Sequence, residues 1–564
     1  YIHTGANGDI PVMLTAKPGN LAGMVSKMGD LGAAIDALEY WYGPYPFERV
    51  GYVLTTDGAL EIPTNIAYPD FMPTQSVINN RGLFTHELGH HWWGDVVTPR
   101  IHNDMWLKEG PAEYSAHLIE EWLGGAPAFV KAVKDNQLFV LKQAHLDDGG
   151  FQALSPMPDE YIYGTHTYYK GAAVMHNLRG YLGDEVFKQA MHDVQANYAY
   201  TDITAEGFKD ALEAVTGVDL DPFFDAWVFA PGFAAFEVRD WSLQHVGPTS
   251  ELTLTIGQKL YGTTQYHNEV PLDFTVISSS GAVFETSIVA SGQESTVVVN
   301  CPFDPAMIVL NRHNRLNQAR MDDEITVVPG ETFNTILPYT QFRLYENTLV
   351  DSTLVRIDHM WSAPDQTPLS EDIIAISNTH YYNVDGLWPE GTSLRGRLYY
   401  YGSSVNDLDH DLIQGDETGI VLVWRPNPMA TWEVYWDQTV NAGSLTNSTG
   451  YITMNTLEKG QYTFAKGTIA IGMDELSTDR GELHLFPVPT QGDLTVSGTA
   501  PPNSTLMVDV FGTDGRLVRR STLKAAGDFA TTLDLGDIVD GTYVLRVMTA
   551  SGKFIGTRRF ELAR

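Results

Sequence analysis

The sequence predicts a multidomain α+β protein, in which a mixed α/β domain with a helical subdomain is followed by three β-sandwich modules. The chain has 564 residues, which is too many for one hydrophobic core. After about residue 80, apolar residues recur three and four positions apart, as they do in amphipathic helices. After about residue 236, this spacing gives way to short alternating and β-branched runs, which are typical of strands. We therefore expect four domains, at residues 1–235, 236–323, 324–480 and 486–564.

The first domain, residues 1–235, is expected to combine a strand with several helices. Val50–Thr55 is a short apolar run of strand length. This order favours a mixed α/β core followed by a helical subdomain. Four later segments have the spacing of amphipathic helices: Ala112–Leu123, Ala128–His145, Gly171–Leu182 and Ala205–Thr216.

The two middle domains are expected to be antiparallel β-sandwiches. Leu252–Ile256 alternates apolar and polar residues, and Thr296–Val299 is rich in β-branched residues. Leu398–Tyr401 and Ile420–Trp424 give the same signal in the larger of the two modules. Aromatic residues are frequent there. If exposed, they would favour carbohydrate or protein binding, but aromatic residues in strands more often pack in the core.

The last module, residues 486–564, contains short apolar runs separated by turn pairs such as Asp514-Gly515. This pattern predicts a compact antiparallel sandwich. The preceding stretch, Gly472–Gly481, is polar and turn-rich and has no sustained helical or strand period. We expect it to be an exposed domain boundary.

Charge and composition exclude several classes of protein. The chain has 35 basic and 70 acidic residues, whereas residues 486–564 hold 9 basic and 8 acidic ones, so the acidity belongs to the rest of the chain. Such a surface repels phosphates, and we expect no nucleic-acid partner. No apolar run approaches the length of a bilayer, so no transmembrane segment is expected. Cys301 is the single cysteine, which excludes an internal disulfide and predicts a packed thiol.

The segment around residue 88 contains the pattern H-E-x-x-H. His86 and His90 are four residues apart and therefore project from one face of a helix, where two imidazoles can bind one zinc ion. Glu87 is placed to deprotonate a metal-bound water rather than to bind the metal, which is hydrolytic chemistry. The alternative is that both histidines are ordinary helix residues with local partners. A third ligand decides between the two interpretations.

Glu109 is the candidate third ligand. It follows His90 by nineteen residues, in the first turn of a helical pattern that begins near Met105. Pro111 fits such a first turn because the amides there have no intrahelical acceptor. A carboxylate completes His₂Glu coordination and leaves the fourth position to water, which is the arrangement of catalytic zinc. Glu113, four residues later, is expected to be a solvated helix carboxylate rather than a partner of a ligand histidine.

These motifs resemble the aminopeptidase N family of zinc gluzincins. In that family the H-E-x-x-H pattern is followed, after eighteen residues, by the ligand glutamate, as it is here. Gly58–Glu61 is similar to the family's G-A-M-E-N, Tyr168–Gly171 to its Y-x-K-G, and Phe223–Trp227 to the end of its catalytic region. The resemblance implies a thermolysin-like zinc metallopeptidase catalytic domain that holds one Zn²⁺ per chain through the three ligands named above.

The resemblance also implies roles for individual residues. Glu87 is the catalytic base, and Tyr168 points at the scissile carbonyl. Glu61 grips the free α-amine of a peptide or protein substrate, with Ala59 on the same loop and Tyr163 lining the site. The implied function is the removal of N-terminal residues, which is an aminopeptidase activity. Two alternatives stay open: a zinc endopeptidase, and a catalytically inactive protein that binds a surface ligand.

Three departures from the family pattern bear on the substrate. Leu60 and Ile62 replace the methionine and the asparagine of G-A-M-E-N, and Lys108 replaces the asparagine before the ligand glutamate. The family also carries a β-rich domain ahead of the catalytic one, and the stretch before Gly43 is too short for it. Because that domain walls part of the family's substrate pockets, substrate specificity is not carried over.

The C-terminal module resembles the sorting domain of cargo for the type IX secretion system. Gly541–Val547 and Arg564 fit the family's G-x-Y-x-L-R-V and its basic end, whereas Val488 and Gly512 depart from its P-N-P-T and D-x-x-G-R. An ordinary terminal β module is the alternative. The resemblance implies an exported bacterial protein, secreted or at the cell surface, with the secretion machinery as a partner. Tyr1 begins no signal peptide, and we expect that an export signal has been removed.

Overall fold

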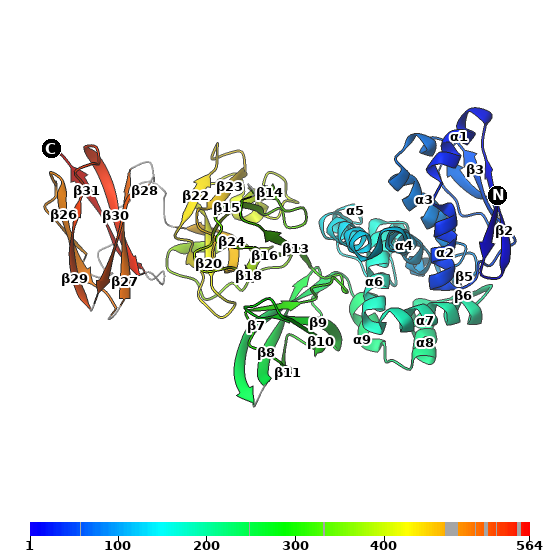
Figure 1. Ribbon diagram of the computed structural model, residues 1–564. Coiled ribbons are helices and arrows are strands. Elements are labelled where there is room, and N and C mark those ends of the chain that lie inside the picture. The colour runs from blue at the N-terminus through cyan, green and yellow to red at the C-terminus, as the bar shows by residue number, and fades with distance from the viewer. Residues whose placement is uncertain are drawn as a thin grey trace. The chain divides into compact units, whose positions relative to one another are not determined.

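The structure, a computed structural model, divides into two compact units, Tyr1–Gly467 and Thr468–Arg564, called here the first and the second unit. The expected boundary Gly472–Gly481 and the turn Asp514-Gly515 lie outside the described residues. In the first unit the helices gather in the N-terminal part, and the strands from β7 onward form the rest (Figure 1). The structure describes residues 1–56, 58–246, 249–330, 333–467, 483–501, 504–512, 517–525, 527–549 and 554–564.

The first unit begins with a four-stranded sheet in the order β1–β2–β3–β4. β1 and β2 form an antiparallel hairpin, whereas β2, β3 and β4 are parallel to one another. Parallel neighbours need a crossover connection, and α1 and α2 supply it between β2 and β3. The predicted strand Val50–Thr55 is β3, with the same bounds. The other elements are β1 (Ile2–Gly5), β2 (Gly8–Thr15), α1 (Pro18–Lys27), α2 (Leu31–Tyr42), β4 (Ile66–Pro69), η1 (Met72–Thr74) and α3 (Val77–Gly89).

Helix α3 is fixed to this sheet by buried tyrosine hydroxyls. Tyr52 of β3 donates to the carbonyl of Phe84 at 2.7 Å, and Tyr68 of β4 donates to the carbonyl of Asn80 at 3.2 Å. Ser76 caps the helix, because its hydroxyl accepts a backbone N–H of the first turn. The end of α3 that carries the H-E-x-x-H motif is therefore held by the strands beneath it.

Helix α4 (Trp106–Phe139) follows and contains one non-helical residue, Gly125 (φ 67°, ψ −167°), which separates the two helical segments predicted there. The predicted helices Gly171–Leu182 and Ala205–Thr216 are α6 and α8, with the same bounds. In the part of the chain that the structure describes, no helix is both long and apolar enough to cross a membrane. The other elements of this region are β5 (Val97–Pro99), η2 (His102–Asp104), η3 (Val140–Ala144), α5 (His145–Asp147), η4 (Asp159–Tyr161), η5 (His166–Lys170), α7 (Asp184–Asn197), β6 (Thr201–Ile203) and α9 (Asp221–Trp227).

Small residues let α4 pack closely against α3 and α6. A Cβ atom on Gly89 of α3 would lie 2.6 Å from the Oγ atom of Ser115 on α4. A Cβ atom on Gly110 of α4 would lie 2.9 Å from the Cα atom of Gly171, where α6 begins. Neither glycine can be replaced without moving a helix, so these crossings fix where the first turn of α4 lies relative to the end of α3.

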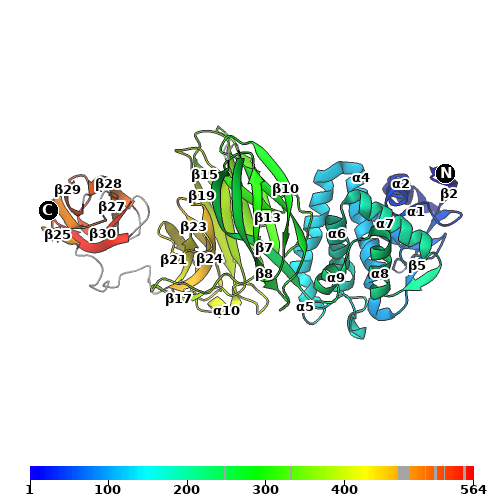
Figure 2. The ribbon, with the colours of Figure 1, turned by 90° about the horizontal axis from the view of Figure 1, so that it is seen from below.

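A first β-sandwich follows the helices (Figure 2). The sheets β11–β8–β7 and β10–β9–β12 share one core, to which all six strands contribute buried side chains. The predicted runs Leu252–Ile256 and Thr296–Val299 lie in β8 and β11, and Cys301 is buried at the end of β11. The strands are β7 (Phe233–Val246), β8 (Thr249–Tyr261), β9 (Val270–Ile277), β10 (Val283–Ala290), β11 (Glu294–Cys301) and β12 (Met307–Leu310).

The second β-sandwich pairs a seven-stranded sheet, β13–β16–β18–β24–β20–β21 with β17 on β24, with a five-stranded sheet, β14–β15–β19–β23–β22. β13 spans the domain boundary expected at residue 324. Trp432 is fully buried, in agreement with a core role for the aromatic stretches. The elements are β13 (Arg320–Val327), β14 (Asn334–Ile336), β15 (Arg343–Thr348), β16 (Thr353–Met360), β17 (Ile373–Ile376), β18 (Tyr381–Leu387), β19 (Ser393–Tyr401), α10 (His410–Ile413), β20 (Ile420–Arg425), β21 (Glu433–Val434), β22 (Gln438–Asn441), β23 (Thr449–Met454) and β24 (Gly460–Gly467).

The second unit is the third β-sandwich, and it confirms the predicted fold class. Its three-stranded sheet β25–β26–β29 and its four-stranded sheet β28–β27–β30–β31 share a core drawn from this unit alone. The strands are β25 (His484–Phe486), β26 (Asp493–Thr499), β27 (Ser504–Gly512), β28 (Leu517–Ala525), β29 (Asp528–Asp534), β30 (Gly541–Thr549) and β31 (Phe554–Leu562).

Candidate active site

Three predicted metal ligands meet where the end of α3 faces the start of α4. The Nε2 atoms of His86 and His90 are 3.1 Å apart, and the Oε2 atom of Glu109 lies 3.5 Å from the first and 3.2 Å from the second. A tetrahedral zinc ion with bonds of about 2.0–2.1 Å spaces its ligand atoms about 3.3 Å apart. All three side chains are buried. The donor set and its spacing fit one zinc ion, and three protein donors leave the fourth position of a tetrahedral zinc to water or substrate.

Hydrogen bonds behind the two imidazoles orient them. The Nδ1 atom of His86 lies 3.0 Å from the Oε2 atom of Glu113, and the Nδ1 atom of His90 lies 3.0 Å from the carbonyl oxygen of Trp93. When each Nδ1–H donates outward, both Nε2 lone pairs face the centre. The expectation that Glu113 is a solvated carboxylate is therefore wrong: it is turned toward α3, because α3 and α4 pack closely enough for its carboxylate to reach the imidazole.

Glu87 lies between the ligand pair in sequence, and only 5% of its surface is exposed. Burial raises the pKa of Glu87 to about 7, and the carboxylates of Glu61 and Glu109 add to this effect. A dication held at the centre acts in the opposite direction. A carboxyl group in this environment can take up and release a proton near neutral pH.

Tyr168 lies on η5 and stacks on a ligand imidazole. The ring centroids of Tyr168 and His86 are 5.9 Å apart, with an angle of 18° between the planes. Burial, together with the negative charges of Glu109 and Glu87, raises the pKa of Tyr168. The hydroxyl is therefore protonated at neutral pH and available as a hydrogen-bond donor. Tyr163 is 60% exposed, at the outer side of this region.

Buried polar groups anchor η5. The Oδ2 atom of Asp148 accepts the backbone N–H of His166 at 2.7 Å. The same oxygen is 2.7 Å from the imidazole Nδ1 atom of His166. Lys170 is fully buried and donates to the carbonyls of Gln152 at 3.1 Å and Ala230 at 3.0 Å. Sequence reasoning did not single out these anchors. The lysine of Y-x-K-G, Lys170, was the one sequence feature that could have indicated an anchor. Its partners are backbone carbonyls, which a pattern of side chains does not identify.

Glu61 reaches the same centre and is already paired. Lys108, the residue before Glu109, forms an ion pair with the Oε1 atom of Glu61. The segment that carries Glu61 is held by two backbone hydrogen bonds between Leu60 and Ala67, of 3.1 and 2.9 Å. Ala59 is half-buried on this segment. The predicted amine-binding carboxylate of Glu61 therefore lies near the candidate metal ligand Glu109, and Lys108 forms an ion pair with it.

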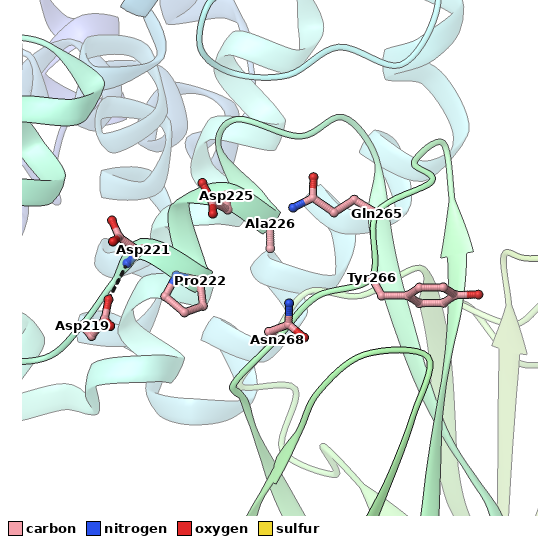
Figure 3. Close-up of a pocket in the computed structure, with 8 residues that line it drawn as sticks. All are labelled: Asp219, Asp221, Pro222, Asp225, Ala226, Gln265, Tyr266 and Asn268. Atoms are coloured by element: carbon pink, nitrogen blue, oxygen red, sulfur yellow. Dashed lines mark hydrogen bonds between the residues drawn. The ribbon is translucent and has the colours of Figure 1, made fainter.

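A second group of carboxylates lies elsewhere in the first unit. Glu213, Asp219 and Asp221 offer oxygens within 4.8 Å of one another. Asp219 accepts the backbone N–H of Asp221 at 3.0 Å, and Lys209 forms an ion pair with Asp221 at 2.5 Å. The adjoining cavity of about 170 Å³ lies between the start of α9 and the connection from β8 to β9, and Gln265 lines its far side (Figure 3). Glu213 accepts the backbone N–H of Leu220 at 2.8 Å, so backbone hydrogen bonds and the lysine account for these three carboxylates.

Two segments of the chain match known protein families. Residues 48–227, which include the three candidate metal donors together with Glu61, Glu87 and Tyr168, match the profile of the Peptidase family M1 domain. Zinc is the metal that the M1 domain and its donor set imply. Residues 484–558 match the profile of the Secretion system C-terminal sorting domain, so the predicted resemblance of the tail is confirmed.

Curated relatives align with part of the chain. Aminopeptidase M1 of Arabidopsis thaliana is 25% identical over 224 residues, which are 36% of this chain and 25% of the plant protein. Tricorn protease-interacting factor F2 of Thermoplasma volcanium is 23% identical over 311 residues, which are 53% of this chain and 34% of that protein. Probable aminopeptidase 2 of Sulfurisphaera tokodaii is 29% identical over 159 residues, which are 27% of this chain and 20% of that protein. The aligned part thus spans between a fifth and about a third of these relatives.

Solved structures of peptidases also align with the chain. Aminopeptidase A of Legionella pneumophila, solved in complex with aspartic acid, aligns at 18% identity with a TM-score of 0.44 over 56% of this chain and 37% of that one. A mutant of an M1 zinc metallopeptidase from Deinococcus radiodurans, bound to a Tyr-Ser-Ala substrate, aligns at 23% identity with a TM-score of 0.36. The alignment covers 40% of this chain and 51% of that one.

Proposed function

We propose that this chain is a zinc-dependent aminopeptidase whose metal is held by His86, His90 and Glu109. The observation that carries the proposal is the convergence of these three donors, at 3.1–3.5 Å from one another, beside a buried glutamate and a protonated tyrosine. When bound, zinc supplies Lewis-acid chemistry to the scissile carbonyl and to the attacking water. This chain's own residues supply the remaining roles.

The roles of the residues follow from their environments. Glu87 takes the proton of the attacking water at its carboxylate and returns it to the leaving amine. The Tyr168 hydroxyl donates a hydrogen bond to the carbonyl oxygen as negative charge develops there. The carboxylate of Glu61, which is paired with Lys108 through its Oε1 atom, receives the α-ammonium of the substrate. Ala59 and Tyr163 line the approach to this position.

A free α-amine is the feature that distinguishes the proposed aminopeptidase from an endopeptidase. A buried carboxylate that pairs with an ammonium loses that partner when the substrate is N-acetylated. We expect peptides and aminoacyl amides with a free N-terminus to be the better substrates. Efficient cleavage of N-blocked peptides at internal bonds, away from the first residue, would assign the chain to the endopeptidases instead.

The test combines metal analysis with one assay. Purified protein should contain about one zinc per chain, and it should release a fluorophore from aminoacyl substrates. Glu87→Gln should retain the metal and lose the activity, because the amide cannot accept the proton. Protein that binds no zinc and is inactive would support instead a surface-binding protein with a relict catalytic domain.

We also propose that residues 484–564 direct export through a type IX secretion system, with the protein secreted or held at the cell surface. The support is the match of residues 484–558 to the Secretion system C-terminal sorting domain. The partner in this step is the secretion machinery, and the partner in catalysis is a peptide or protein. Fusing residues 484–564 to an unrelated periplasmic protein in a host with this system tests the proposal, since the fusion should reach the cell surface.

A further inference from the structure

Lys108 places a permanent positive charge beside the carboxylate that is proposed to bind the substrate's α-amine. Its ammonium forms an ion pair with the Oε1 atom of Glu61 and lies 3.8 Å from the Oε1 atom of Glu109. Only 20% of the Lys108 side chain and 14% of the Glu61 side chain are exposed. This is therefore a largely buried pair within the candidate site, unlike a surface ion pair.

The backbone holds the lysine in this position. A Cβ atom on Gly94 would lie 3.0 Å from the Cγ atom of Lys108 and 3.2 Å from its Cδ and Cε atoms, so the aliphatic stem packs on a bare backbone. Gly94 has a φ of 128°, a conformation that side chains other than glycine rarely adopt. The stem lies against this surface, which limits how far the ammonium can move away from Glu61.

The ion pair between Lys108 and Glu61 lowers the preference of the site for a substrate with a free α-ammonium. A buried glutamate without a cation is costly, and an α-ammonium that neutralises it is strongly preferred over a neutral amide. Here the carboxylate is neutralised before the substrate arrives. An incoming α-ammonium must share Glu61 with a like charge, whereas an acylated N-terminus leaves the ion pair intact. Both effects reduce the advantage of a free N-terminus.

We propose that Lys108 is a specificity-determining residue that competes with the substrate's α-ammonium for Glu61, and so widens the substrate class to peptides with acylated N-termini. The inference rests on the proposed role of Glu61 and adds a second cation to it. Lys108 acts on substrate recognition and leaves the chemical step to Glu87 and Tyr168. Glu109 and Asp95 also face the lysine and are retained in every variant used below. Glu87 faces it too and is replaced by Gln in all of the variants used for binding, so its charge does not differ between them.

Binding to an inactive enzyme tests the proposal without relying on turnover. The full chain carrying Glu87→Gln is loaded with zinc, and calorimetry gives dissociation constants for trialanine amide and its N-acetyl form. Their ratio, acetylated over free, is the readout. We expect a ratio below about ten with Lys108 present and an increase of at least about tenfold in Lys108→Asn, since the unpaired carboxylate then demands a cation. Lys108→Arg retains the charge and should retain the low ratio.

The outcomes are distinct. A ratio that stays the same or falls in Lys108→Asn overturns the proposal, as does failure of both peptides to bind any variant. Zinc content and thermal unfolding of each variant show whether the substitution has disturbed the ligand next to it. The parent enzyme is then assayed with both peptides. If it hydrolyses neither while the binding ratio shifts as expected, the proposed activity fails and the inference about Lys108 stands.

Discussion

The carboxylate of Glu113 lies 3.0 Å from the Nδ1 atom of His86, one helical turn beyond the proposed ligand Glu109. The two glutamates are four residues apart on α4 and therefore share a face, so one turn of helix supplies both a metal donor and the orienting partner of another donor. The same helix start also carries Lys108. This short segment thus carries a proposed metal donor, a glutamate that contacts another proposed donor, and the lysine paired with Glu61.

The first prediction concerns Glu113→Gln. Removing the charge behind His86 should weaken zinc binding by about 10- to 100-fold while leaving the fold intact. Competition with a chromogenic chelator measures the affinity. Glu185→Gln is the matched control, because Glu185 is an exposed carboxylate on α7. Equal zinc affinity in the two variants would show that Glu113 does not support the metal site.

The second prediction concerns Tyr168→Phe. A donor to a developing oxyanion typically supplies about 3 kcal/mol, so kcat should fall on the order of a hundredfold. Zinc content should be unchanged, because the Tyr168 hydroxyl is not one of the proposed metal donors. Tyr169→Phe, whose ring packs on Phe139, is the control and should keep wild-type kcat. A wild-type kcat in Tyr168→Phe would remove this tyrosine from the mechanism.

The third prediction concerns Lys170, which is held between two carbonyls without a carboxylate beside it among the contacts that the structure describes for it. Burial lowers the pKa of Lys170 to about 7. An unfolded lysine titrates near 10.4, so the unfolded state binds more protons than the folded state between pH 7 and about 10. Stability contributed by this group should therefore rise with pH in that window and be lowest below it.

Denaturant unfolding between pH 7.5 and 9.5 measures this effect. The free energy of unfolding of the parent should increase relative to that of Lys170→Met by up to about 1.4 kcal/mol per pH unit. The difference in slope is the readout, because the substitution also removes two hydrogen bonds at every pH. Lys131→Met, which changes an exposed lysine, should show the parent's slope. Parallel slopes for the parent and Lys170→Met would mean that the buried amine titrates as it does in water.

Local sequence patterns predicted several elements of the first unit. The bounds of β3, α6 and α8 follow from the apolar spacing alone, because each of these elements buries one face or run against a neighbour. The metal donors were also predicted. A spacing of four residues on a helix fixes two donors relative to each other, and Glu109 was indicated by the motif around it.

Contacts between segments were not predictable in the same way. Glu113 was expected to face solvent, because its direction depends on how closely α3 and α4 cross, and that distance is set by Gly89 against Ser115. The pairing of Lys108 with Glu61 joins a helix start to a loop far from it in sequence. The sequence showed Lys108 as a departure from the family pattern and Glu113 as a possible partner of a ligand histidine. Which partner each charged side chain reaches depends on how the segments pack.

The last prediction concerns removal of the tail. The core of the second unit draws all of its buried members from residues 483–562, and the core clusters around the candidate site draw none from there. Stabilities of units without a shared core are usually independent, so a chain that ends after Ser477 should fold, keep one zinc per chain and retain kcat/KM within about twofold.

In the native host, the same truncation should abolish delivery to the cell surface, because the sorting domain matched at residues 484–558 is then missing. Cell fractionation followed by peptidase assay measures this directly, with the full chain as the reference and Glu87→Gln as the control for background activity. Normal surface delivery of the truncated chain would remove the sorting interpretation. Loss of zinc or of folding in the purified truncated chain would show instead that the first unit requires the tail for its own stability, even though the two share no buried core.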